Sequence, residues 1–165
     1  MRIQAKDPRL ISLMGEFMRA YLPGVRNRDE DTITSYRYSI NLFVTYLESE
    51  HKVTVMTMQS SDFSQKNIVS FMAWLKSERK NVATTINHRL SDLRGFCKYL
   101  YKKNALSLTE YEEIREISDV DDDRMIDFTW LSVNDVYLVL KSTDSNREAI
   151  RDRFLLSLLY ESGAR

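Results

Sequence analysis

The sequence contains few of the residues that cross-link a chain or interrupt its helices. Of 165 residues, one is cysteine, two are proline and four are glycine. The single cysteine, Cys97, excludes an internal disulfide framework and any metal site built from several cysteines. Its spacing from Leu93 and Leu100 predicts a small core residue. Because prolines and glycines are scarce, long uninterrupted helices are expected, and the predicted fold class is all-α.

Long hydrophobic runs are also lacking. No apolar stretch approaches the roughly 18 residues of a membrane span. Residues 1–8 do not form the apolar stretch of a secretion signal. Hydrophobic residues still make up 43% of the chain, which is enough for the buried core of an ordinary domain. The sequence therefore predicts a soluble globular protein of the cytoplasm, with no membrane partner.

Apolar residues recur at helical spacing in four segments of comparable length, and a shorter fifth segment follows. Short connections between such helices predict a compact four- to five-helix bundle, with an extended connection over residues 53–58. The predicted helices run from Pro8 to the Pro23-Gly24 pair, from residues 29–31 to about His51, from Ser64 past Leu75, from Asn81 or Ala83 past Leu100, and from Leu108 to Ile117. The predicted core includes Leu10, Ile11, Met14, Phe17, Met18, Tyr21, Leu22, Ile33, Tyr36, Ile40, Phe43, Val44, Leu47, Ile68, Phe71, Met72, Leu75, Ile86, Leu90, Leu93, Cys97 and Leu100, with Trp74 partly inside.

Charge divides the chain into two halves although the net charge is zero. Residues 1–109 hold 17 basic and 10 acidic side chains, which gives +7, and residues 110–165 hold 7 basic and 14 acidic ones, which gives −7. Within the first half, the segment from Lys76 to Lys103 has eight basic residues against two acidic ones. Such a basic helix is typical of a surface that contacts phosphates, and it is equally compatible with a solvated helix face.

Short or flat polar side chains lie opposite the core stripe of the fourth predicted helix, and a similar face exists on the second. Such faces can lie close to a duplex, with base edges or sugars within reach in the major groove. His88 could instead be a plain surface histidine, and a metal role is not predicted because His51 is the only other histidine. The predicted DNA-binding residues are Thr34, Ser35, Tyr38, Asn41, Thr84, Asn87, His88, Ser91, Arg94 and Lys98.

Several segments share a pattern with a known family. The first reads Thr32-Ile33-x-x-Tyr36-x-x-x-Ile40-x-x-Phe43-x-x-Tyr46-Leu47, and the second reads Thr85-Ile86-Asn87-x-Arg89-Leu90-Ser91-x-Leu93-Arg94-x-Phe96-x-x-Tyr99-Leu100. They are followed by Trp130-Leu131-Ser132-x-x-Asp135-Val136 and by a run that ends Tyr160-Glu161-Ser162-Gly163-Ala164-Arg165. Together, over about residues 8–165, these segments resemble the tyrosine recombinases, which are phage-integrase-like site-specific recombinases.

The resemblance implies a SAM-like core-binding domain of the integrase N-terminal type, followed by the start of a catalytic domain. The implied domains are a DNA-binding domain at residues 1–118, an acidic linker at 119–127 and the first helices of a truncated catalytic domain at 128–165. The implied partner is double-stranded DNA, and the implied working assembly is a tetramer on two DNA sites.

The resemblance also implies a reaction, in which a tyrosine hydroxyl attacks a phosphodiester and forms a 3′-phosphotyrosyl linkage. No metal or other cofactor is needed. Arg165 matches the first catalytic arginine of the family. A planar guanidinium suits this role because the pentavalent transition state gathers negative charge on its non-bridging oxygens.

The chain departs from the family pattern at three places. The catalytic lysine, the histidine and arginine cluster and the nucleophilic tyrosine of the family follow the first arginine, whereas all nine tyrosines here precede Arg165. Ala164 stands where the family usually has leucine or another apolar residue, and residues 119–123 are acidic where the connection is often basic. We therefore expect a monomeric or dimeric fragment that neither cleaves nor joins DNA and that exposes the apolar side chains of Phe154, Leu155, Leu158 and Leu159.

A second interpretation stays open, namely a non-catalytic helical module for protein interactions. Its basic face would bind an acidic protein or simply face solvent, and Arg165 would be an ordinary terminal side chain. DNA binding that weakens steeply as salt rises would favour the recombinase interpretation, because phosphate contacts release counterions.

Overall fold

The computed structural model describes residues 5–121, 132–142 and 147–162, and every regular element in these ranges is helical. The prediction of an all-α fold is thus confirmed. The chain separates into two compact units, residues 1–123 and 124–165. The division into domains at 118 and 128 stays a prediction, because residues 122–131 lie outside the described ranges. The first unit contains α1 (Pro8–Glu16), η1 (Phe17–Val25), α2 (Glu30–His51), η2 (Ser60–Asp62), α3 (Gln65–Ser77), α4 (Ala83–Lys102) and α5 (Leu108–Arg115).

Local capping explains where most of these helices begin. The side chain of Asp29 accepts a hydrogen bond from the backbone N–H of Thr32 at the start of α2, and Ser64 caps α3 in the same way. At the start of α5, Ser107 and Glu110 form a reciprocal capping box. The predicted starts of α2, α3 and α5 are confirmed. They could be predicted because each capping residue lies within three residues of the backbone group that it caps.

The predicted first helix ends beside the Pro23-Gly24 pair, as expected, but its second half is a π-helix, which the sequence did not predict. α1 passes directly into η1, a π-helix that includes Pro23 and ends at Val25. In an α-helix the proline ring clashes with the carbonyl four residues earlier, and the wider π turn relieves this clash. The backbone N–H of Arg26 donates a hydrogen bond to the carbonyl of Tyr21 at 3.0 Å, so backbone hydrogen bonding continues after the proline.

The core of the first unit is an unbroken chain of aromatic rings. The Phe17 ring lies 5.1 Å from that of Phe96, Phe96 lies 5.2 Å from Phe63, and Phe63 lies 5.1 Å from Phe43. All four side chains are at most 1% exposed. Phe63 belongs to the connection before α3, so the core extends beyond the helical stripes that the sequence pattern indicated.

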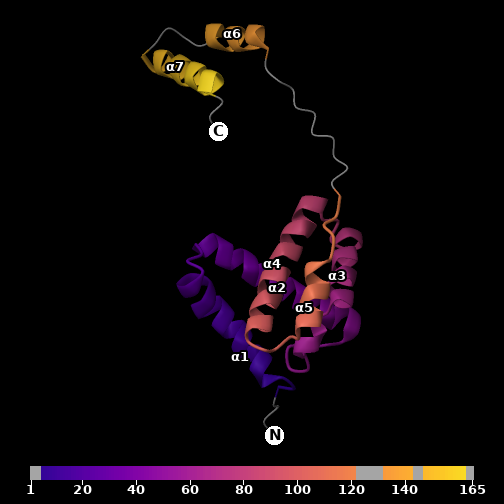
Figure 1. Ribbon diagram of the computed structural model, residues 1–165. Coiled ribbons are helices and arrows are strands. Elements are labelled where there is room, and N and C mark those ends of the chain that lie inside the picture. The colour runs from indigo at the N-terminus through magenta and orange to yellow at the C-terminus, as the bar shows by residue number, and fades with distance from the viewer. Residues whose placement is uncertain (1–4, 122–131, 143–146, 163–165) are drawn as a thin grey trace. The chain divides into compact units, whose positions relative to one another are not determined.

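The predicted core stripes are otherwise confirmed. Most predicted core residues are buried, and the others are partly buried. Those packed against the core while partly exposed are Met14, Met18, Tyr21, Ile33, Tyr36 and Trp74, and Ile11 is half-buried on α1. α4 packs against α2, α3 and α5 and runs alongside α5 (Figure 1). Its central place among these helices means that one face of α4 is fully buried while the opposite face is left for other contacts.

The second unit contains α6 (Val133–Ser142) and α7 (Arg147–Ser162). Apolar side chains of the two helices, among them Val136 and Leu159, line a shared hollow of about 190 Å³. Phe154 and Leu158 are 66% and 51% exposed, and Leu155 and Leu159 are exposed as well, as the sequence predicted. Among the described residues, no helix is both long and apolar enough to cross a membrane.

Asp7 joins the start of α1 to the connection that precedes α3. Its Oδ1 accepts from the backbone N–H of Leu10 at 2.9 Å, and its Oδ2 accepts from the N–H and the hydroxyl of Ser60 at 3.1 and 2.9 Å. Burial raises the pKa of the Asp7 carboxyl, but the hydrogen bonds from Leu10 and Ser60 together outweigh burial and hold the pKa below its ordinary value of 3.8.

We predict that Asp7→Ala lowers the free energy of unfolding by about 1–2 kcal/mol at neutral pH, because a helix cap and a tertiary contact are lost together. Glu48→Ala, an exposed position on α2, is the matched control. A carboxyl whose folded pKa is depressed stabilises the fold above its unfolded pKa and loses that effect as pH falls through the folded pKa. In urea unfolding, the difference between wild type and variant should therefore shrink below about pH 4. A difference that stays constant down to acid pH would contradict this role.

Candidate nucleic-acid interface

Four of the predicted DNA-binding residues of α4 form one exposed stripe. Thr84, His88, Ser91 and Lys98 recur at spacings of three, four and seven residues, which places them on one side of the helix. All four are exposed, and Leu90, Leu93 and Cys97 are buried on the opposite side. On α2, Thr34, Tyr38 and Asn41 are likewise exposed at helical spacing. The two helices therefore present neighbouring polar faces.

A buried carboxylate holds these two helices together. Asp92 of α4 is only 5% exposed, and its Oδ2 accepts hydrogen bonds from the hydroxyls of Ser39 and Ser35 of α2 at 2.5 and 3.0 Å. Arg89 Nη1 donates to the Ser39 hydroxyl at 3.1 Å and lies 4.0 Å from Asp92 Oδ2. A buried charge is costly without such partners, so these contacts fix how α2 and α4 are placed relative to each other.

The same cluster brings two predicted DNA-binding residues into direct contact. His88 Nε2 lies 2.9 Å from the Ser35 hydroxyl and 4.0 Å from Asp92 Oδ2. The His88 side chain nevertheless remains 61% exposed. It is therefore a surface histidine held in one orientation by α2, and its ring still faces outward from the seam between the helices.

Arg89 also positions Tyr38, which sequence reasoning had placed on the DNA-binding face. The Arg89 guanidinium carbon lies 4.5 Å from the centroid of the Tyr38 ring, and Tyr38 is 50% exposed. Arg89, Ser39 and Asp92 were absent from the predicted site. A signal for them existed in the spacing, because Arg89 and Asp92 are three residues apart on one helix and Ser35 and Ser39 are four apart on the other.

Asn87 and Arg94 lie on the other flank of α4 and bind the segment that follows α5. The Asn87 side-chain amide donates to the carbonyl of Val120, and its Oδ1 accepts from the N–H of Val120, both at 2.8 Å. Arg94 forms an ion pair with Asp119 at 3.0 Å and donates to the carbonyl of Ile117. We call residues 117–120 the strap. The structure thus uses both side chains internally, and their contact with DNA stays a prediction.

Arg165 and Cys97 are the two remaining residues for which the sequence predicts a role or a place. Arg165 lies outside the described residues. Within residues 5–121, 132–142 and 147–162, there is no group of three histidine, cysteine or acidic side chains that could hold a metal ion. Cys97 is completely buried, as predicted, and burial raises the pKa of its thiol far above the ordinary range.

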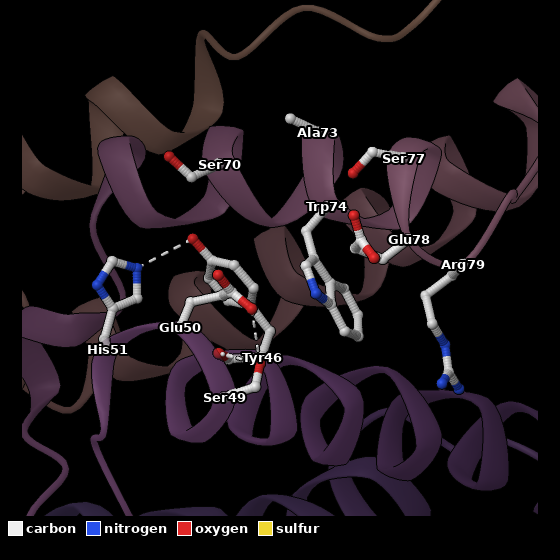
Figure 2. A pocket seen from close by; sticks show the side chains of 10 residues that line it. All are labelled: Tyr46, Ser49, Glu50, His51, Ser70, Ala73, Trp74, Ser77, Glu78 and Arg79. Carbon is white, nitrogen blue, oxygen red and sulfur yellow. Dashed lines mark hydrogen bonds between the residues drawn. The ribbon is translucent and has the colours of Figure 1, made fainter.

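A separate hollow of about 650 Å³ lies between the end of α2 and α3 (Figure 2). The Tyr46 hydroxyl lies 3.1 Å from His51 Nε2 on one side of it, and the Arg79 guanidinium lies 5.7 Å from the Trp74 ring on the other. Glu50 and Glu78 also line it, so the Arg79 guanidinium shares this hollow with two carboxylates. Repulsion between these carboxylates and phosphates makes this hollow a poorer nucleic-acid surface than the α2 and α4 faces.

We predict that Asp92→Ala lowers the free energy of unfolding by about 2–3 kcal/mol, because the hydroxyls of Ser35 and Ser39 lose their buried acceptor and Arg89 loses the nearby negative charge. Asp92→Asn keeps one acceptor oxygen and should cost less. Glu113→Ala on α5 removes an exposed carboxylate and serves as the control, with a change within about 0.5 kcal/mol. Urea unfolding followed by circular dichroism measures all three. A loss for Asp92→Ala no larger than that of Glu113→Ala would show that the cluster contributes nothing to stability.

A second prediction concerns the strap. Asn87→Ala removes both hydrogen bonds to Val120, so the Val120 amide should exchange with solvent at least about tenfold faster, a change equivalent to about 1.4 kcal/mol. Asn41→Ala, at an exposed position of α2, should leave that rate unchanged. Hydrogen exchange followed by NMR gives the comparison, and equal rates in wild type and Asn87→Ala would mean that the strap is held by other contacts.

Comparisons with known proteins agree with this architecture. Residues 16–104 match the family model described as phage integrase, N-terminal SAM-like domain. The chain is 29% identical to tyrosine recombinase XerC of Syntrophus aciditrophicus over 93% of its own length and 48% of the relative. It is 27% identical to XerC of Herpetosiphon aurantiacus, covering 88% of the chain and 45% of the relative. It is 25% identical to tyrosine recombinase XerD of Oceanobacillus iheyensis, covering 85% of the chain and 44% of the relative.

The chain spans just under half the length of these curated relatives. No solved structure matches it significantly. The family model covers the bundle from the end of α1 past α4, which includes the seam around Asp92. This chain therefore belongs to the family of phage integrase N-terminal SAM-like domains, and it is homologous to tyrosine recombinases over most of its length.

Proposed function

We propose that this chain binds double-stranded DNA as the N-terminal part of a site-specific tyrosine recombinase. The observation that carries the proposal is the exposed polar stripe of α4, held beside the polar face of α2 by the Asp92 cluster, in a domain of this family. An α-helix fits the major groove of B-DNA, and short side chains such as Ser91 allow the helix to approach base edges closely.

The charge around this stripe supports the same partner. Lys98 lies on the stripe and Lys102 follows one turn later, and both are exposed. The acidic residue of α4, Asp92, is buried and already bonded to two hydroxyls and close to Arg89. Phosphates that approach α4 therefore meet lysine side chains and no exposed carboxylate of α4 itself, which favours the long-range attraction that DNA binding needs.

Asn87 and Arg94 have a secondary place in this proposal. To contact DNA they would have to release the strap, and so lose the hydrogen bonds to Val120 and Ile117 and the ion pair with Asp119. Ser91 and Lys98 on the stripe are exposed and form no hydrogen bond or ion pair with the strap. Direct readout by Ser91 and His88, with Tyr38 and Asn41 on the neighbouring face, is thus the simplest arrangement.

Strand cleavage and assembly complete the proposal. In the full recombinase Arg165 would contact the non-bridging oxygens of the transition state, where paired hydrogen bonds from a guanidinium are most effective. Cytoplasmic location and a tetramer on two DNA sites belong to the same proposal. They follow from the family and its DNA substrate, and the geometry of the bundle supports only the DNA-binding step.

A titration of a labelled duplex, followed by fluorescence anisotropy, tests the DNA-binding step. We expect a dissociation constant in the micromolar range, which rises steeply between about 50 and 200 mM salt because counterions are released. Lack of duplex binding at low salt would refute the proposal and favour a module for protein interactions.

Two added negative charges on α4 test where the interface lies. Thr84→Glu combined with Ser91→Glu puts two carboxylates on the stripe of α4, so duplex binding at low salt should weaken by about tenfold or more. Gln65→Glu combined with Ser77→Glu changes the net charge equally on α3 and should weaken binding much less. Equal losses for the two double variants would show that only net charge matters and that α4 does not face the duplex.

A further inference from the structure

A narrow crevice opens where η1, α2 and α4 meet. Its volume is about 40 Å³, and its lining includes the aromatic side chains of Phe17, Tyr21 and Tyr36. Arg26, Lys98 and Lys102 line it as well. The two lysines continue the exposed stripe of α4, so the crevice lies at one end of the face that we propose to contact DNA. Arg26 comes from the other side, just after the π-helix.

Among the residues that the structure describes, Arg26, Lys98 and Lys102 have no acidic partner, whereas other basic residues on or next to α4 do. Arg94 pairs with Asp119, Lys103 pairs with Glu16 at 2.7 Å, and Arg89 lies beside Asp92. Within the described part of the chain, the side chains of Arg26, Lys98 and Lys102 form no hydrogen bond or ion pair, and no carboxylate lines the crevice. Three positive charges therefore converge on a small hollow without compensation.

Gly95 lines the crevice next to Tyr36. A Cβ atom at this position would lie 2.5 Å from the Tyr36 hydroxyl oxygen, so only glycine lets the Tyr36 ring rest against the backbone of α4. Burial, followed by the charge of Asp92, raises the pKa of Tyr36, while Arg28 and Arg26 act in the opposite direction. The phenol thus keeps its proton at neutral pH and is available as a hydrogen-bond donor beside the cations.

We propose that this crevice seats one phosphate group, supplied in this protein by the backbone of the bound DNA. The proposal rests on the proposed function for that source. A crevice of about 40 Å³ can admit the non-bridging oxygens of one phosphate and is too small for a base or a sugar. Arg26 offers two parallel N–H donors, and the lysines add charge from the α4 side.

A seated phosphate would fix the register of α4 in the groove. Phosphate contacts carry no sequence information themselves, but they set which base pairs face the helix. With one phosphate held at Lys98 and Lys102, Ser91 and His88 lie two to four turns further along the same helix side, toward its N-terminus. The seat would therefore determine which bases these two side chains can reach.

The experiment compares Arg26→Gln, Lys102→Gln and their double variant with a Lys6→Gln and Lys66→Gln control, all in the full chain. Each phosphate contact contributes about 0.9 to the slope of log affinity against log salt for duplex DNA. If both cations hold the same phosphate, each single variant should lower the slope and the double variant should lower it by no more than about one unit. A loss of about two units would mean two separate phosphates, and a loss equal to that of the control would mean none. Either result would overturn the seat.

A single uncharged methylphosphonate, moved along the duplex, locates the phosphate. At one linkage it should weaken the wild-type chain by about fivefold to tenfold and leave the double variant unchanged, because the partner of that phosphate is already gone. A uniform effect at all linkages, or the same profile in both proteins, would contradict a single seat.

A titration with inorganic phosphate distinguishes a crevice that binds no phosphate from a chain that binds no DNA. NMR of the Gly95 amide during a phosphate titration should show a saturable shift in the wild type and none in the Arg26→Gln and Lys102→Gln double variant. A shift in a chain that binds no duplex would support a seat for free phosphate and overturn the DNA source. No shift in the wild type, together with salt slopes equal to those of the control, would overturn the seat while duplex binding still stands.

Discussion

The packing of Phe17 is the contact on which the rest of the first unit depends. Its ring lies 5.1 Å from Phe96 of α4, 5.4 Å from Tyr36 of α2 and 5.0 Å from Tyr99 of α4. Phe17 is also the first residue of the π-helix, so the change in helical pitch occurs where the ring enters the core. One buried side chain thereby joins three elements, and burial of such a ring contributes about 1.5–3 kcal/mol. The placement of the exposed faces of α2 and α4 therefore follows from this packing.

A polar layer adds specificity to that apolar anchor. Aromatic packing alone would tolerate some sliding of α2 along α4, whereas the hydrogen bonds of Asp92 to Ser35 and Ser39 require one register. The cost of burying a carboxylate is offset only in that register. Because Arg89 and His88 are attached to the same cluster, the orientation of the surface residues follows from a contact that is itself hidden from solvent.

Helix positions could be predicted from the sequence because their causes are local. Asp29 and Ser64 cap helices within three residues, and the apolar stripes follow from spacing alone. The π-helix over Phe17–Val25 was not predicted, because the apolar spacing before Pro23 is that of an ordinary α-helix. The roles of Asn87 and Arg94 could not be predicted, because they depend on tertiary contacts with the strap. Both are polar residues on the outer half of α4, and only the fold shows that the strap lies against them.

The strap also explains how a chain with zero net charge can present a basic face. Asp119 of the acidic half pairs with Arg94, which places a negative charge on the flank of α4 that is turned toward the strap. On the opposite flank the acidic group is Asp92, which is buried and already bonded. The uncompensated cations then lie between these flanks and beside η1, at Arg26, Lys98 and Lys102. Because electrostatic attraction at contact depends on charges within about a Debye length, roughly 8–10 Å, this local arrangement decides what α4 attracts, and the net charge of the chain does not.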